Sequence, residues 1–95
     1  MESRESELSS SKTNFEKVVQ FNKSFGVPIF DTPQRNIVVE NPALTKLRLD
    51  LILEETKELA EAIRDNDFTE IADALADILY VVYGAGASFG IDLDR

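Results

Sequence analysis

Two long helical segments separated by a very short turn constrain the fold of this chain more than any other feature. Apolar residues recur through residues 42–64 at the 3.6-residue spacing of one helix face. Asn41 and Pro42 suit the N-cap and the first position of that helix. Residues 68–89 are apolar nearly all round, as in a helix buried on most sides. The three residues 65–67 leave room only for a tight reversal, which predicts two antiparallel neighbouring helices.

A shorter helix is predicted to precede this hairpin. Thr13 followed by Glu16 has the spacing of a capping box, and Gly26 suits the residue just past a helix end. Residues 27–40 are predicted to form an extended connection, because a strand at 37–39 would find no partner strand. The expected fold class is therefore all-α, an antiparallel helical bundle.

The length of the chain predicts one domain. Ninety-five residues are near the lower limit for a chain that folds alone, so we expect the core to be completed by oligomerisation. Residues 1–12 are polar and serine-rich, and we predict a disordered tail there. Residues 13–95 are then the single helical domain.

Composition excludes several classes of function. The chain has no cysteine and no histidine, which rules out disulfides, thiolate sites and histidine-based catalysis. A net charge of −8 argues against a nucleic-acid partner. Residues 1–12 lack a signal-peptide pattern, and residues 71–89 are a poor membrane span because acidic residues and glycines interrupt them. We therefore expect a cytoplasmic protein with no membrane partner.

Acidic residues recur on the predicted facing sides of both long helices. Glu55 falls on the apolar stripe of its helix, where an unpaired carboxylate costs stability unless a cation meets it. An antiparallel hairpin brings Glu58 toward Asp73 and Glu54 toward Asp77, so like charges converge and raise one another's pKa. Alone, residues 54–58 have the simpler interpretation of a solvated acidic surface. Together the two helices predict a divalent-cation site among Glu54, Glu55, Glu58, Glu70, Asp73 and Asp77.

The donor chemistry of this predicted site indicates the cation and the reaction. Carboxylate oxygens without sulfur or imidazole favour Mg²⁺, with Mn²⁺ as the alternative. A Mg²⁺ ion held by a few carboxylates usually takes substrate phosphates as further ligands and activates water. Hydrolysis of a phosphoanhydride, with a remaining carboxylate as general base, is the chemistry that these features predict.

The sequences EETKE at 54–58 and EIADALADILYVVYGAG at 70–86 resemble the all-α nucleoside triphosphate pyrophosphohydrolases, the MazG-like superfamily. This superfamily includes the phosphoribosyl-ATP pyrophosphohydrolases, and its signature is EExxE on one helix and ExxD on the next. The segments VVQFNKSFGVP and YGAGASFGID are similar to a small branch of the same superfamily. The resemblance covers residues 14–95. It implies hydrolysis of a nucleoside triphosphate to the monophosphate and pyrophosphate, with Mg²⁺, in a homodimer or homotetramer.

The resemblance also implies roles for individual acidic residues. Ala74 occupies the position of the ExxD glutamate, so either Glu70 and Asp73 form the motif one turn earlier, or Asp73 and Asp77 share the ligand role. We favour the second alternative, with Glu70 in an outer position. Glu55 is the predicted catalytic residue. The predicted metal ligands are Glu54, Glu55, Glu58, Asp73 and Asp77.

Four polar residues are candidate substrate contacts: Arg48 and Lys57 for phosphate, and Gln20 and Asn22 for the base. The simpler interpretation of each is a solvated surface side chain. Family members usually continue past GID into a further helix, which is expected to be absent because the chain stops at Arg95. That absence and Ala74 support an alternative function, a catalytically silent helical module that binds nucleotides or dimerises.

Overall fold

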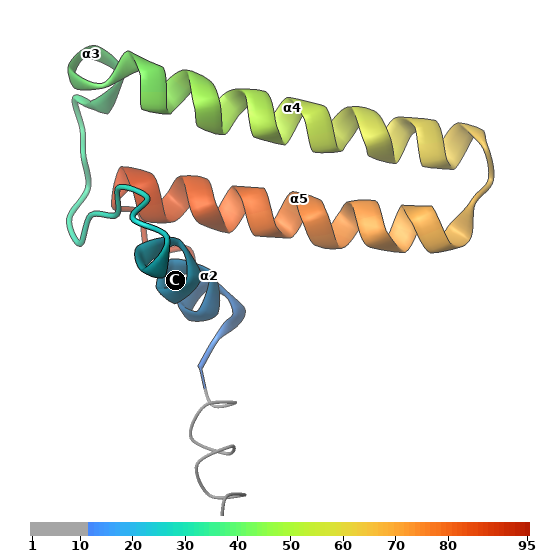
Figure 1. Cartoon of the computed structure of the whole chain (residues 1–95), viewed down its shortest axis with the longest axis horizontal. Helices are drawn as coiled ribbons and strands as arrows, with labels where there is room; N and C mark the ends of the chain where they lie inside the picture. The colour runs from blue at the N-terminus through green and yellow to red at the C-terminus, as the bar shows by residue number, and fades with distance from the viewer. Residues whose placement is uncertain (1–11) are drawn as a thin grey trace, which may run out of the picture.

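The computed structural model describes residues 12–95, and all regular secondary structure in this range is helical. In chain order the helices are α2 (Asn14–Ser24), α3 (Ile37–Glu40), α4 (Pro42–Arg64) and α5 (Phe68–Phe89). α4 and α5 run antiparallel side by side, and α2 packs across the C-terminal part of α5 (Figure 1). The predicted all-α fold is confirmed. Apart from Lys12, the predicted tail lies outside the described residues.

The starts of α2, α4 and α5 are fixed by side-chain caps, as predicted for α2 and α4. The amide of Glu16 donates to Thr13 Oγ1 at 3.0 Å, and the amide of Thr13 donates back to the Glu16 carboxylate at 3.0 Å. Such caps satisfy amides that have no partner within the first turn of a helix. Side-chain oxygens of Asn41 and Asp67 accept in the same way at the starts of α4 and α5.

Both α4 and α5, which pack against each other, bury small side chains. Ala62 of α4 and Ala74, Val81 and Ala85 of α5 are buried. Small residues let two helices approach closely, so little water can enter between them. A charged group that points into this contact therefore loses much of its hydration.

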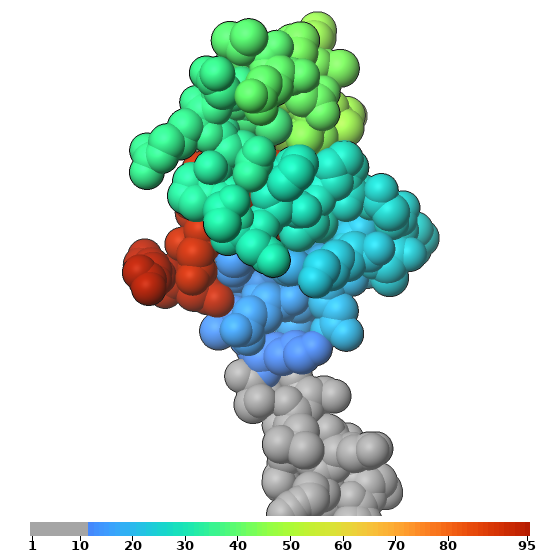
Figure 2. Space-filling model, turned by 90° about the vertical axis from the view of Figure 1, so that its left-hand side faces the viewer, coloured from blue at the N-terminus to red at the C-terminus, as the bar shows by residue number. Residues whose placement is uncertain are grey.

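The connection from α2 to α4 is held by the C-terminal end of α5. The last carbonyls of a helix have no partner within the helix, and here the loop supplies two amides. The amide of Phe30 donates to Ala87 O at 3.1 Å, and that of Gln34 donates to Phe89 O at 2.9 Å. Figure 2 shows this end of the molecule, with the blue-green loop lying between the start of α4 and α2. The loop therefore completes α5.

The prediction of an extended connection is wrong for residues 37–40, which form the single helical turn α3. The amides of Glu40 and Asn41 each donate to a backbone carbonyl four residues earlier, at 2.9 and 2.8 Å. This turn satisfies locally the backbone groups that a strand would have left without a partner. It also buries Ile37, whereas Val38 and Val39 point to solvent.

α5 is, within residues 12–95, the one helix long and apolar enough to cross a membrane, with a mean hydropathy of 1.3 over its most apolar stretch. Core helices of soluble proteins meet the same criteria, and 39% of that stretch is buried in the structure. α5 also packs against both α4 and α2. The expectation that no membrane is involved stays a prediction.

We predict that Gly90→Ala destabilises the protein by about 2–5 kcal/mol, because it combines backbone strain with overpacking. Gly90 has a φ of 72°, and a Cβ atom there would lie 1.8 Å from the carbonyl oxygen of Thr32. The nearest atoms belong to the backbone of Thr32 and Pro33, so the loop would have to move away from the end of α5. Urea-induced unfolding measures the change in the free energy of unfolding.

Gly26→Ala is the matched control. Gly26 has a similar φ of 74°, but a Cβ atom there would meet nothing within 4 Å. It should cost about 1–2 kcal/mol, the strain of the left-handed conformation alone. Equal losses for the two variants would mean that the contact between Gly90 and Thr32 does not hold the loop.

Candidate metal centre

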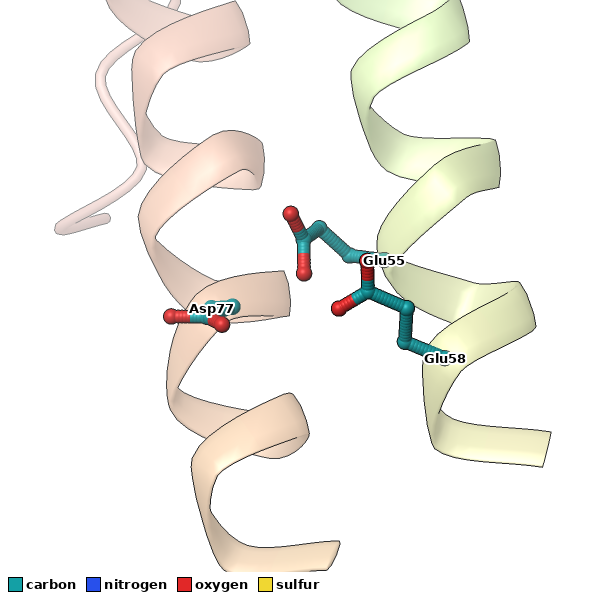
Figure 3. Close-up of side chains that lie close together, drawn as sticks. All are labelled: Glu55, Glu58 and Asp77. Carbon is teal, nitrogen blue, oxygen red and sulfur yellow. The ribbon is translucent and has the colours of Figure 1, made fainter. Parts of the chain in front are cut away.

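Three carboxylates from the two long helices come together at the middle of the hairpin. α4 carries Glu55 and Glu58 three residues apart, on one helix face. α5 places Asp77 opposite them, and one oxygen of each residue lies within 4.8 Å of one oxygen of both others (Figure 3). The antiparallel pairing of α4 with α5 therefore builds a compact acidic group, as the sequence predicts.

Glu55 occupies the least hydrated position of this group. Its Oε1 atom is buried and has no hydrogen-bond partner within residues 12–95. Loss of hydration raises the pKa of Glu55, and the negative charges of Glu58, Asp77 and Glu54 raise it further. A buried oxygen without a hydrogen-bond donor is costly, and neither of the ion pairs found within residues 12–95 includes Glu55.

The residues present fit a hard divalent cation. Two helices present three carboxylates, and one buried oxygen among them has no hydrogen-bond donor in the part of the chain that the structure describes. A positive charge would relieve the repulsion among these groups. Oxygen-only donor sets suit Mg²⁺ or Mn²⁺, and neither cysteine nor histidine is present in the chain to favour a softer metal. Glu58 and Asp77 are exposed, so the group is open to a phosphate ligand on one side.

The other predicted ligands lie around this group rather than within it. Glu54 precedes Glu55 by one residue, so its side chain points about 100° away around α4. Its charge still raises the pKa of Glu55. Asp73 is exposed one turn before Asp77, and Glu58 shares its group with Asp77; the predicted approach of Glu58 to Asp73 stays a prediction. Glu70 lies in the first turn of α5, the outermost of the predicted acids.

Two candidate substrate contacts, Arg48 and Asn22, are buried, so their simpler interpretation as solvated surface side chains is wrong. Arg48 is 6% exposed and Asn22 is 5% exposed. The signal in the sequence was the position of Arg48, four residues after Leu44 and seven before Glu55, on the stripe that faces α5.

The guanidinium of Arg48 joins α4 to α2 and α5. Its Nε donates to Ser88 Oγ at 3.0 Å, and its Nη2 donates to Asn22 Oδ1 at 3.4 Å. Ser88 in turn donates to the carbonyl of Pro28 at 3.0 Å. Gly84 leaves the necessary space, since a Cβ there would lie 2.9 Å from Arg48 Nη1. Burial lowers the pKa of Arg48, and its electrostatic interaction with Tyr80 opposes that change.

The remaining two candidates are apart from the three carboxylates. Gln20 accepts a hydrogen bond from Lys12 and lines a hollow of about 650 Å³ between α2, residues 29–31 and the C-terminal residues. None of the three carboxylates lines that hollow. Lys57 is exposed on α4 and belongs to neither of the ion pairs found within residues 12–95. The substrate roles of both residues stay predictions.

We expect Glu55→Gln to raise the melting temperature of the metal-free protein at about pH 8, where glutamate is otherwise ionised. The substitution removes the negative charge of Glu55, which loses hydration and is repelled by the neighbouring carboxylates, so that the pKa of Glu55 is raised. Because this pKa is higher in the folded than in the unfolded state, the wild type gains stability as pH falls. The advantage of the variant should therefore shrink toward about pH 5. Thermal melts in EDTA measure it.

Glu61→Gln is the control for the same substitution on an exposed position of α4. It should change the melting temperature little, because surface substitutions away from special features usually have small effects. If Glu55→Gln instead unfolds the metal-free protein, Glu55 has a structural role and the repulsion argument fails.

Comparisons with known proteins agree with this architecture. The family model for phosphoribosyl-ATP pyrophosphohydrolase matches residues 18–95, which contain α3, α4, α5 and most of α2. An uncharacterized protein of Acanthamoeba polyphaga mimivirus is 53% identical over 83 residues, covering 87% of this chain. The chain spans only 33% of the length of that viral protein. By the extent of the family match, this chain belongs to the phosphoribosyl-ATP pyrophosphohydrolase family.

Proposed function

We propose that this protein is a Mg²⁺-dependent nucleotide pyrophosphohydrolase, which converts a nucleoside or deoxynucleoside triphosphate and water into the monophosphate and pyrophosphate. One observation carries the proposal. In a chain of this family, a buried Glu55 oxygen that has no hydrogen-bond donor among the described residues lies beside Glu58 and Asp77. Carboxylates so placed repel a free phosphate chain. A divalent cation reverses the local charge and lets the phosphates approach.

The residues of the group then have distinct roles. Glu55, Glu58 and Asp77 would hold the cation, with Glu54 and Asp73 at its edge. The cation, when bound, supplies charge neutralisation for the phosphates and activation of water. Glu55 has two oxygens, so one can face the cation while the other accepts a proton from the attacking water. Mn²⁺ meets the same ligand requirements and is the alternative metal.

Pyrophosphate release from a panel of nucleoside triphosphates, with and without Mg²⁺, tests this proposal. Glu55→Gln should lower kcat by about 100- to 10,000-fold, the usual contribution of a general base. Asp77→Asn should raise the Mg²⁺ concentration needed for activity, because it removes one oxygen charge from the three-carboxylate group. Asp73→Asn should cost only about 10- to 100-fold, as is typical of groups outside the ligand set.

Glu61→Gln and Asp50→Asn are the matched controls on α4. Both carboxylates are exposed, and Asp50 is paired with Lys46 rather than with the acidic group. Neither substitution should change kcat. If the wild type binds Mg²⁺ and nucleotide but releases no pyrophosphate, the result would contradict hydrolysis and favour the catalytically silent binding module. Ala74, which is buried and occupies the position of the family glutamate, supports that alternative.

We also propose that a second copy of the chain covers the aliphatic face of the hairpin, defined by Leu49, Leu53, Leu75 and Leu79. All four are half-exposed. Leu53 is two residues from Glu55, and Leu75 and Leu79 are each two residues from Asp77, so these side chains project away from the carboxylates. A second copy could pack there and leave the acidic group open.

Leu53→Lys should therefore shift the protein toward the monomer in sedimentation velocity, because an apolar interface does not accommodate an unpaired charge. Val39→Lys, at an exposed position of α3, is the control and should not change the sedimentation coefficient. A wild-type protein that remains monomeric at high concentration would contradict the assembly.

A further inference from the structure

Three aromatic side chains form a continuous exposed surface where α2 meets α5, which we call the aromatic shelf: Phe21, Phe25 and Tyr80. The rings of Phe21 and Phe25 are 4.7 Å apart, and those of Phe21 and Tyr80 are 5.8 Å apart. The three residues are 50%, 70% and 40% exposed, in that order. So much aromatic surface in water is unfavourable and indicates a binding surface.

The aromatic shelf begins one helical turn from the candidate metal centre. Tyr80 follows Asp77 by three residues on α5, so their side chains are neighbours on one helix face. Along the helix axis they are separated by about 4.5 Å. α2 packs across this same C-terminal half of α5 (Figure 1). Phe21 thereby lies beside Tyr80, and Phe25 lies beside Phe21.

The aromatic shelf is separate from the aliphatic face that a second copy would cover. Leu79 is adjacent to Tyr80 in sequence but projects about 100° away from it around α5. Leu75 lies on the side opposite Asp77, two residues before it. The shelf therefore shares its side of the hairpin with the carboxylates, and a dimer formed through the aliphatic face would leave both exposed.

We propose that the aromatic shelf stacks the nucleobase of the substrate while the phosphates are held at the three carboxylates, an inference that rests on the proposed function. A nucleotide has a planar π-system at one end and phosphates at the other. The surface has the same order, with exposed rings at one end and a cation-demanding acidic group at the other. Aromatic rings and bases stack readily because both present flat π-faces.

Stacking also determines what kind of selectivity the shelf provides. Every base has a π-face, so stacking strengthens binding of purine and pyrimidine nucleotides alike. The rings of Phe21 and Phe25 offer no hydrogen-bonding group to a base edge. The shelf thus separates nucleotides from inorganic polyphosphates, and its two phenylalanines contribute affinity rather than a choice among bases.

Isothermal titration calorimetry with Mg²⁺ tests the aromatic shelf independently of turnover. The ligands are the α,β-methylene analogues of dATP and dUTP, which resist cleavage, and inorganic tripolyphosphate, which lacks a base. Phe21→Ala and Phe25→Ala should each weaken binding of both nucleotides by about 5- to 150-fold. Binding of tripolyphosphate should not change. Phe25→Trp keeps a stacking ring and should retain nucleotide affinity.

Phe68→Ala is the matched control, because Phe68 is 80% exposed at the start of α5, at the opposite end of the hairpin. It should leave all three affinities unchanged. If the Phe21→Ala and Phe25→Ala variants bind the nucleotides as the wild type does, the base-stacking role of the shelf is overturned and the proposed function stands. If wild-type protein binds neither nucleotide, both are overturned. Loss of self-association in these variants would mark the shelf as an interface between copies and overturn it as a base site.

Discussion

The close packing of α4 against α5 is the interaction on which the rest of the structure depends. Small side chains such as Ala62 and Ala74 let the helices approach, and burial of their apolar surface holds them together. The same packing brings Glu55, Glu58 and Asp77 within 4.8 Å of one another. Apolar burial therefore offsets a local electrostatic repulsion, which a proton or a cation would relieve.

A second polar cluster, formed by Arg48, Ser88 and Asn22, joins the C-terminal end of α5 to α2 and α4. Arg48 is a buried cation in a chain of net charge −8, yet its recorded hydrogen-bond acceptors are the neutral oxygens of Ser88 and Asn22. Neutral acceptors stabilise a buried guanidinium without drawing in a carboxylate. The cluster thereby fixes α2 against α5, where Phe21 contacts Tyr80.

The two faces of the hairpin divide the proposed functions between them. Glu58, Asp77 and Tyr80 share one side, where a nucleotide would meet a cation and aromatic rings. Leu53 and Leu75 are half-exposed and project away from Glu55 and Asp77 on their own helices, where a second copy would bury apolar surface. Helical periodicity alone keeps these surfaces apart, because residues two positions apart on a helix point in nearly opposite directions. Ala74, buried between the helices, leaves the acidic group one carboxylate smaller than the family signature.

Patterns within single helices determined much of this protein. The caps at Thr13, Asn41 and Asp67 act over three residues, so their helices were predictable, and the short turn after α4 imposed the hairpin that pairs Glu55 with Asp77. Only the tertiary structure decided the exact partners. Whether Glu58 meets Asp73 or Asp77 depends on the axial register of two packed helices, to which periodicity is insensitive. The burial of Arg48, and the turn α3 in place of an extended segment, likewise depend on distant groups such as Gly84 and Ser88, whose approach no local pattern records.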